Sequence, residues 1–485
     1  MSILSDRINT LLHPRSVAII GASDNPSAIG YWPLYYSKLY GYAGDLFAVN
    51  PKYQSVQDVV CLPDISGLPT DLDLAVVATP KDVFLTQLRQ GQWEDRAKSI
   101  VLFSSGFGEV PDHAKDEELV ASLHRRGITL LGPNSIGFLT ARIGLAATFT
   151  QVLQKHGPSH MAQPIAFISQ SGAFGARSYS ALRYAGISVA YFVSTGNEAG
   201  LGVVDFVDGA QALMDVKALF IYLENGHDGS RLLDCVDRAV GRGMKVVVLA
   251  SGRSVAGQRA AASHTGAVAP EWRILRRLLE EAGAVVVDGI RDLIGAAGLL
   301  ASGKRIAGRR IGIVTSSGGA GVQAADAAEE RRFTVPELPR ELQMRLSEHV
   351  PYFGSLRNPV DLTGSVLGGA DSVGHVVSKM LHSDSVDALL VDVTKPHVGA
   401  VAAAATLSEK VVVMTMADAT TDDLREMVEL GVAGANDARD CLAAMEVLVE
   451  RPSLRSPTED EDIEFVERAG RHNEGALRSS SQSPL

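Results

Sequence analysis

The sequence predicts an α/β protein made of three consecutive units, each built around a largely parallel sheet. Short apolar runs recur along the chain, and each is followed by a loop rich in glycine, serine, asparagine or proline. The 47 glycines and the 46% content of hydrophobic residues suit the many strand-to-helix turns of such a fold. The segment that begins at Ile311 also repeats the one that begins at Ile165, which indicates that a unit was duplicated.

The first unit contains apolar runs that we expect to form strands. Their boundaries are 16–20, 46–49, 74–77, 99–103 and 128–131. A loop of small polar residues follows each run, and the carboxyl ends of parallel strands meet at one edge of a sheet. These loops should therefore line a single crevice.

The loop after the first run, Gly21-Ala22-Ser23, is similar to the first turn of a nucleotide-binding βαβ unit. Glycine at that turn lets the backbone approach a phosphate, and the start of the next helix favours negative charge. A further glycine at Gly30 does not complete the G-x-G-x-x-G pattern. We expect these three residues to take part in a nucleotide-like site.

A cation follows the second expected strand, in Asn50-Pro51-Lys52, where a dehydrogenase would place an acidic residue against a ribose. Lys52 suits a phosphate-bearing adenosine instead, such as the 3′-phosphate of coenzyme A or the 2′-phosphate of NADP. A lysine that is only solvated on a loop remains the alternative. Thr79 and Pro80 should line the wall of the crevice, and Asn134 lies in the loop that closes the unit.

The second unit begins at Pro164, after a stretch that we expect to be irregular. Its first strand leads through Ser171, Gly172 and Ala173 into a helical pattern. The start of a helix offers backbone N–H groups and a positive dipole end to an anion, and a serine hydroxyl adds another donor. These three residues are therefore a candidate phosphate cradle.

Two further expected strands of this unit are followed by candidate catalytic residues. One strand, 218–223, ends at Glu224, and the other, 246–249, leads into a glycine- and serine-rich loop that contains Ser263-His264-Thr265-Gly266. Taken alone, a single histidine in such a loop is weak evidence, because most such residues are bystanders.

The third unit repeats the plan of the second. Ser317 and Gly318 fall on Ser171 and Gly172, and the strands at 386–391 and 410–414 echo those at 216–221 and 245–249. Thr394 or Lys395 lies near the place of Glu224, and no second histidine loop follows. The polar loop 358–362 is interpreted as structural. These matches favour two flavodoxin-like units related by duplication.

Composition excludes several classes of protein. The net charge of −11 disfavours nonspecific nucleic-acid binding. The three cysteines lack the spacing of a disulfide framework or a zinc site, so we expect no metal site and a reducing cytoplasm. No signal peptide and no membrane span is expected.

With these motifs in place, the chain resembles the α-type part of the NDP-forming acyl-CoA synthetases, relatives of succinyl-CoA synthetase. The resemblance covers about residues 10 to 450. It rests on seven motifs in the family's order: Gly21-Ala22-Ser23, Asn50-Pro51-Lys52, Gly132-Pro133-Asn134, Ser169-Gln170-Ser171-Gly172, Gly196-Asn197, Ser263-His264-Thr265-Gly266 and Asn358-Pro359-Val360-Asp361.

The resemblance implies a domain plan. Residues 1–145 would form a CoA-binding Rossmann-like domain, and residues 160–303 a flavodoxin-like ligase domain that carries the histidine loop. Residues 308–450 would form a second flavodoxin-like ligase domain. A polar tail at 451–485 is expected to be disordered. No ATP-grasp domain is expected in this chain.

The family's reaction interconverts acyl-CoA, phosphate and ADP with free acid, CoA and ATP, so the resemblance implies an enzyme with coenzyme A as a substrate. His264 would carry phosphate as a phosphohistidine, because a neutral imidazole is a good nucleophile near pH 7. Glu224 would hold the other ring nitrogen, and the cradle at Ser171, Gly172 and Ala173 would bind phosphate. The first unit's site residues would bind CoA: Gly21, Ala22, Ser23, Lys52, Thr79, Pro80 and Asn134.

The family also implies a partner. An ATP-grasp β subunit would supply the ATP/ADP site with Mg²⁺, in a hetero-oligomer or homo-oligomer. The chain departs from the family pattern at Ala250, Pro270 and Ser316-Ser317, which puts loop detail and the choice of acid in doubt. A non-catalytic regulator that binds CoA or acyl-CoA is the alternative, and a nicotinamide-dependent dehydrogenase would fit only the first 140 residues.

Overall fold

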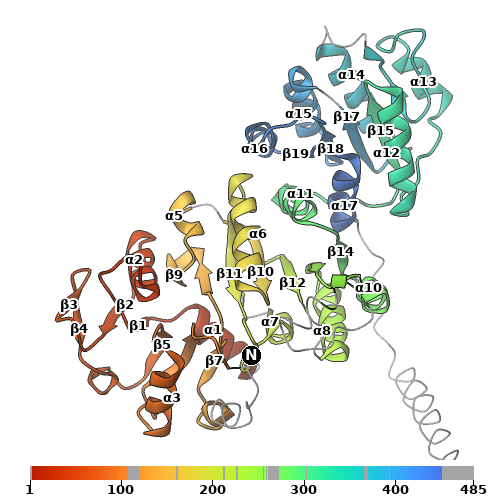
Figure 1. Cartoon of the computed structure of the whole chain (residues 1–485). Helices are drawn as coiled ribbons and strands as arrows, with labels where there is room; N and C mark the ends of the chain where they lie inside the picture. The colour runs from red at the N-terminus through yellow and green to blue at the C-terminus, as the bar shows by residue number, and fades with distance from the viewer. Residues whose placement is uncertain are drawn as a thin grey trace, which may run out of the picture. The chain divides into compact units, whose positions relative to one another are not determined.

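The computed structural model of the protein describes residues 3–107, 121–159, 162–210, 213–224, 228–254, 256–257, 259, 272–301, 303–364, 370–392 and 394–449. These residues form three sheets flanked by helices (Figure 1). Residues 1–450 form one compact unit, and the tail from 451 onward lies outside the described residues, as do His264 and the loop around it.

The first sheet has the strand order of a dinucleotide-binding fold. Its order is β3-β4-β2-β1-β5-β6-β7, and all neighbours are parallel except β3 and β4. The strands are β1 (Ser16–Ile20), β2 (Asp45–Val49), β3 (Ser55–Val56), β4 (Val59–Leu62), β5 (Leu72–Val77), β6 (Ala97–Leu102) and β7 (Thr129–Leu131). The helices described in this part are α1 (Ile3–Leu12), α2 (Trp32–Leu39) and α3 (Lys81–Arg89). The order reverses between β1 and β5, which is where such folds bind ligands.

The second sheet has a flavodoxin-like core, β14-β13-β12-β10-β11, extended by β8 and β9. Its strands are β8 (Gly137–Thr140), β9 (Leu145–Thr148), β10 (Gln163–Ser169), β11 (Val189–Ser194), β12 (Ala218–Leu223), β13 (Lys245–Ala250) and β14 (Val285–Val287). The helices described here are α5 (Val152–His156), α6 (Gly172–Tyr184), α7 (Val203–Asp208), α8 (Gly229–Gly241), α10 (Trp272–Glu281) and α11 (Ile290–Ala301).

The stretch expected to be irregular before Pro164 is in part an antiparallel hairpin, so that expectation was wrong. Strands β8 and β9 pair with each other, and β8 pairs antiparallel with β11. The hairpin was missed because its strands are only four residues long and are rich in glycine, alanine and threonine, so they lack a clear apolar run.

The third sheet repeats the flavodoxin-like order as β16-β15-β17-β18-β19, all parallel. Its strands are β15 (Ile311–Thr315), β16 (Val360–Asp361), β17 (Ala388–Asp392), β18 (Val411–Thr415) and β19 (Ala433–Ala435). The helices described are α12 (Gly318–Glu330), α13 (Arg340–Leu346), α14 (Ala370–Leu381), α15 (Val398–Thr406), α16 (Thr421–Glu429) and α17 (Ala438–Leu448).

Strand registers establish which residues of the two flavodoxin-like units correspond. Ile165 lies opposite Ala218, and Ile311 lies opposite Ala388, as the sequence repeat predicts. In the second unit β12 pairs with β13, and Lys245 lies opposite Ala218. In the third unit the equivalent pair is β17 with β18, and there Val411, not Lys410, lies opposite Ala388. The sequence match of Lys410 with Lys245 was therefore wrong by one residue.

The predicted polar loop at 358–362 is structural, and its last residues also form strand β16. The Asn358 side chain accepts from the Ile313 amide at 2.9 Å and donates to the Ile311 carbonyl at 2.8 Å and the Pro336 carbonyl at 3.1 Å. Both Ile311 and Ile313 belong to β15, so this asparagine joins the loop to the start of the sheet.

Equivalent helices of the two units pack on each other. By the strand registers, Asp292 in α11 corresponds to Asp440 in α17. A Cβ atom added at Gly295 would lie 3.0 Å from the Cβ of Ala444, so the glycine permits close approach of the two helices. Leu299 of α11 shares a core cluster with residues of α17.

Candidate functional site

The first part of the site is the turn after β1, at the point where the strand order of the first sheet reverses. Gly21 has a φ of +87°, and a Cβ there would lie 3.1 Å from the Thr79 side chain. A side chain at this position would be strained and crowded, so the turn requires glycine. Ala22 is fully buried in the core, and its amide bonds to the Val49 carbonyl at 3.3 Å.

The loop after β2 is tied to this turn. The Asn50 side chain donates to the Ala22 carbonyl at 2.8 Å and accepts from the Lys52 amide at 3.0 Å. Lys52 is exposed, so its ammonium group is free to meet solvent or a ligand beside the turn. Ser23 is buried, and its hydroxyl accepts from the Asn25 amide at 3.0 Å. The structure therefore brings Gly21, Ser23 and Lys52 to one edge of the sheet.

Thr79 and Pro80 lie at the same edge, after β5. The Thr79 hydroxyl is buried and has no hydrogen-bond partner among the described residues, which is costly unless a ligand or water fills the place. Pro80 is exposed and precedes α3 as its N-cap residue. Thr79 and Pro80 thus lie at the carboxyl edge of β5, with the Thr79 side chain next to the turn at Gly21.

A chain of hydrogen bonds leads from this edge toward the second sheet. The Ser104 hydroxyl donates to the Thr79 carbonyl at 2.7 Å, and the Asn134 amide donates to the Ser104 carbonyl at 2.9 Å. The Asn134 side chain then donates to the Asn197 side chain at 3.1 Å, in the loop after β11. The backbone amide of Asn197 in turn donates a hydrogen bond to the Pro133 carbonyl oxygen at 2.9 Å. Asn134 thus connects the carboxyl edges of the two sheets.

The predicted phosphate cradle is a capped helix start. Ser171 is the N-cap of α6, and its hydroxyl accepts from the Phe174 amide at 3.4 Å. The Ser169 hydroxyl donates a hydrogen bond to the Ser171 carbonyl at 2.7 Å, which fixes the turn between β10 and α6. A Cβ on Gly172 would lie 2.6 Å from the Ile136 side chain, so only glycine fits there without movement. Gly172 and Ala173 are the first residues of the helix, whose amides and dipole favour an anion.

Gln170 joins the cradle to Glu224. Its side-chain oxygen accepts from the Glu224 amide at 2.7 Å, and its side-chain nitrogen donates to Glu198 at 3.1 Å. Glu198 also accepts from the Thr195 hydroxyl at 2.8 Å and the Val203 amide at 2.9 Å. Burial raises the pKa of Glu198, and these donors oppose the rise. The network fixes the position of Glu224 beside the start of α6.

Gln170 and Glu198 were not among the predicted site residues. Gln170 stands inside the Ser169-Gln170-Ser171-Gly172 motif, and Glu198 directly follows the Gly196-Asn197 motif, so both signals were present in the sequence. Their roles could not be inferred because the loop after β11 meets the end of β10 only in the folded sheet.

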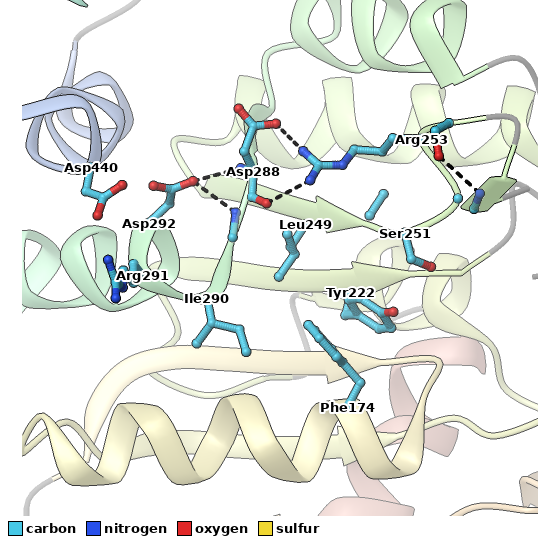
Figure 2. Close-up of a pocket in the computed structure, with 15 residues that line it drawn as sticks. Phe174, Tyr222, Leu249, Ser251, Arg253, Asp288, Ile290, Arg291, Asp292 and Asp440 are labelled. Carbon is cyan, nitrogen blue, oxygen red and sulfur yellow. Dashed lines mark hydrogen bonds and ion pairs between the residues drawn. The ribbon is translucent and has the colours of Figure 1, made fainter. Parts of the chain in front are cut away.

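A pocket of about 900 Å³ opens beside the cradle (Figure 2). At one end the Phe174 and Tyr222 rings stack, with centroids 4.2 Å apart and planes inclined by 24°. Asp292 and Asp440 line the other end. Burial raises the pKa of Tyr222 to about 12, the nearby Glu224 charge adds to the rise, and a hydrogen bond with Ser251 opposes it.

Among the described residues, no cluster of three or more histidine, cysteine, aspartate or glutamate side chains is arranged to hold a metal ion. In that same part of the chain, no helix is long and apolar enough to cross a membrane. His264 cannot be placed against Glu224, because its loop lies outside the described residues.

Comparison with known families matches three successive domains. Residues 15–141 match the CoA binding domain, residues 162–300 the succinyl-CoA ligase like flavodoxin domain, and residues 311–442 the ligase-CoA domain. The fold and the three matched domains together define an acyl-CoA ligase of the succinyl-CoA synthetase type.

Individual relatives agree with this class. The α subunit of ADP-forming acetate–CoA ligase II of Pyrococcus furiosus is 31% identical, over 79% of this chain and 81% of that protein. The α subunit of its ligase I is 33% identical, over 74% of this chain and 78% of that protein. The structure of a dinucleotide-forming acetyl-coenzyme A synthetase 1 of Candidatus Korarchaeum cryptofilum, in complex with phosphate and ADP, superposes with a TM-score of 0.81. It is 29% identical and covers 91% of this chain and 96% of that one.

The chain belongs to the family of ADP-forming acyl-CoA ligase α subunits. The predicted family and fold class are thereby confirmed. The regulatory alternative is not favoured, because the relatives are named as ligases.

Proposed function

We propose that this chain reversibly converts acyl-CoA and phosphate into free acid, CoA and a phosphorylated His264, and that this histidine then exchanges the phosphoryl group with a nucleotide on a partner. In the first step a phosphate oxygen attacks the thioester carbonyl carbon. The C–S bond breaks, CoA leaves as a thiolate, and an acyl phosphate remains. In the second step a ring nitrogen of His264 attacks phosphorus, the bond to the acyl oxygen breaks, and the carboxylate leaves.

Coenzyme A would occupy the edge of the first sheet. The turn at Gly21 and the buried Thr79 hydroxyl would face its polar groups, and the exposed Lys52 would meet its 3′-phosphate. Ser23, Ala22 and Pro80 would act through the shape of the loops, since their contacts hold the chain itself.

The start of α6 would hold the phosphate and the charge that develops on it. Ser171, Gly172 and Ala173 present helix N-terminal groups in a fixed turn, and such preorganised donors stabilise a transition state without reorganising. Glu224 would accept from one ring nitrogen of His264, which fixes the tautomer and stabilises the imidazolium. Gln170 positions Glu224 through its backbone amide.

The observation that carries this proposal is the hydrogen-bonded connection between the two halves of the site. Thr79, Ser104, Asn134 and Asn197 link the crevice of the first sheet to the loop after β11. Glu198, one residue beyond Asn197, bonds to Gln170 at the cradle. A thioester bound at one edge would therefore face phosphate held at the other.

The nucleotide half of the reaction would need a second protein. None of the three matched domains is an ATP-grasp domain. We propose that an ATP-grasp β subunit supplies ATP or ADP with Mg²⁺, and that a small carboxylic acid is the other substrate.

The test is phosphorylation of the purified chain. Incubation with radiolabelled inorganic phosphate and either acetyl-CoA or phenylacetyl-CoA should yield an acid-labile, base-stable phosphoprotein. His264→Ala should abolish the label, whereas His382→Ala, at an exposed histidine in the third unit, should not change it. Glu224→Gln should lower the label about tenfold, since it removes the charge that stabilises the imidazolium.

A regulator that only binds CoA would give a different result. It would bind CoA in a calorimetric titration but acquire no label from phosphate, nor from labelled ATP in the presence of an ATP-grasp partner. That pair of observations would overturn the proposed function.

A further inference from the structure

We propose that the pocket beside the cradle receives the acyl group, and that it selects monocarboxylic acids with an aromatic ring over acetate and over dicarboxylic acids. This inference rests on the proposed function, because it takes the carboxyl group of the acid to lie at the start of α6.

The pocket begins within one helical turn of the cradle. Ser171 caps α6, and Phe174, three residues later, already lines the pocket. Tyr222 lines it from β12, two residues before Glu224. An acid whose carboxyl group lies at the helix start would therefore place its next atoms against these two rings.

The wall of the pocket is flat and apolar at this end. The Phe174 and Tyr222 rings stack at 4.2 Å, and Leu249 and Ile290 line the pocket beside them (Figure 2). Aromatic rings pack favourably on other rings through offset or edge contacts. Burial raises the pKa of Tyr222 to about 12, so its phenol is neutral at physiological pH and adds no charge to this wall.

The size of the pocket does not suit acetate. Its volume of about 900 Å³ lies near the upper end of the roughly 300–1,000 Å³ typical of sites for drug-sized ligands. A two-carbon acid would leave most of this space to water and would contact little of the apolar wall. A ring extends the contact area, and burial of apolar surface is favourable in proportion to area.

The charges of the pocket argue against a second carboxylate. Arg253 of the lining pairs with Asp288, which also pairs with Arg276 outside the lining, so the charge of Arg253 is already matched by a carboxylate. Arg291 is the other basic residue of the lining, and it faces the acidic pair Asp292 and Asp440. Both arginines of the lining thus lie beside aspartates, and a dicarboxylic acid would find its second carboxylate competing with Asp288, Asp292 and Asp440 for them.

The experiment compares the initial rate of phosphoenzyme formation from acetyl-CoA, succinyl-CoA and phenylacetyl-CoA. We expect the apparent second-order rate constant of labelling with phenylacetyl-CoA to exceed that with acetyl-CoA at least tenfold, with succinyl-CoA the poorest. Ile290→Trp narrows the pocket and should lower the ratio of phenylacetyl-CoA to acetyl-CoA at least tenfold. Ile274→Trp, at a half-exposed position on α10, makes the same change away from the pocket and should leave the ratio unaltered.

A preference for acetyl-CoA or succinyl-CoA, or equal loss for every substrate in Ile290→Trp, would overturn the pocket assignment. Absence of label with every acyl-CoA would instead contradict the proposed function. In that case calorimetric titration with phenylacetate still decides the inference. Binding by the unaltered protein that Ile290→Trp abolishes supports the pocket, and absence of binding overturns it.

Discussion

The second and third units share one fold and one turn, yet the side chains beside that turn differ. In both, a hydroxyl at the end of the first strand donates to the carbonyl of the N-cap serine: Ser169 to Ser171 at 2.7 Å, and Thr315 to Ser317 at 2.8 Å. Both serines accept an amide from the first turn of the helix, at 3.4 Å and 3.5 Å. The backbone of the turn therefore does not distinguish the two units.

The side chains around the turn do distinguish them. By register, Ser194 of the second unit corresponds to Asp361 of the third, and Tyr222 corresponds to Asp392. A Cβ on Gly318 would lie 3.1 Å from the Asp361 carboxylate, and the Thr315 hydroxyl contacts Asp392 at 2.9 Å. Burial raises the pKa of Asp392. In the third unit two carboxylates therefore lie beside the helix start, at register positions that hold Ser194 and Tyr222 in the second unit.

The largest effect on phosphoenzyme formation should follow from placing in the second unit a carboxylate that corresponds to Asp361 of the third unit. Ser194→Asp places a negative charge beside the cradle, and like charges about 5 Å apart repel by about 3 kcal/mol at an effective dielectric constant near 20. Phosphoenzyme formation should therefore fall about 100-fold. The assay is incorporation of labelled phosphate, with circular dichroism and thermal unfolding to show that the variant is folded.

The matched control is Asp361→Ser, which makes the reverse change at the same register position. It should alter phosphorylation less than twofold, because that turn takes no part in the proposed reaction. If Ser194→Asp retained full phosphorylation while folded, the difference between the units would not lie in this charge.

An intermediate effect should come from the residue that positions Glu224. Gln170→Ala removes the bonds to the Glu224 amide and to Glu198, and should lower kcat about tenfold with little change in KM for acyl-CoA. Ser316→Ala, at the corresponding place in the third unit, should leave both constants unchanged. Gln170→Glu can still accept the hydrogen bond from the Glu224 amide, but its carboxylate would repel Glu198 instead of donating to it. Full kcat in that variant would therefore contradict the role of the Gln170–Glu198 hydrogen bond.

The smallest effect concerns stability at the contact between the units. Burial and the neighbouring Asp292 raise the pKa of Asp440 to about 6, whereas an unfolded aspartate titrates near its ordinary value. The folded state therefore binds the proton more tightly, and unfolding free energy should fall as pH rises from about 4 to about 6. The charge of Asp437 also raises the pKa of Asp440, and the charge of Arg291 lowers it.

Asp440→Asn should remove this slope. At neutral pH it should raise the unfolding free energy by about 1 kcal/mol, a value that allows for solvent screening of a half-buried group. Denaturant unfolding at pH 4, 5, 6 and 7 measures the slope directly. Asp418→Asn, at an exposed position between β18 and α16, controls for a general loss of charge, and a persisting slope in Asp440→Asn would contradict the assignment.

Long apolar runs made much of this fold predictable. Five strands of the first sheet, and three in each flavodoxin-like unit, stand out because both faces of a parallel sheet are buried. Strand β14, with three residues, and β16, with two, are too short to show a pattern. Strand β11 was missed although it is apolar and the Gly196-Asn197 motif follows it, because that motif was used for the family resemblance and not to mark the end of a strand.

The site was predictable where backbone geometry requires a residue type. Gly21 lies in a turn whose positive φ and close contacts exclude a side chain, Ser171 caps α6, and a side chain on Gly172 would displace Ile136, so the residue types at these positions are informative. Gln170 and Glu198 act through side-chain bonds between distant loops, which no local pattern reveals. The pocket likewise takes residues from several strands and helices, including Asp440 of the third unit.

The packing of α11 on α17 has a further consequence. Because Asp292 corresponds to Asp440 and the two helices are equivalent elements of duplicated units, each presents to the other the same kind of surface. Such self-complementary faces are the basis of two-fold symmetric dimers. In the full chain the third unit covers this face of α11.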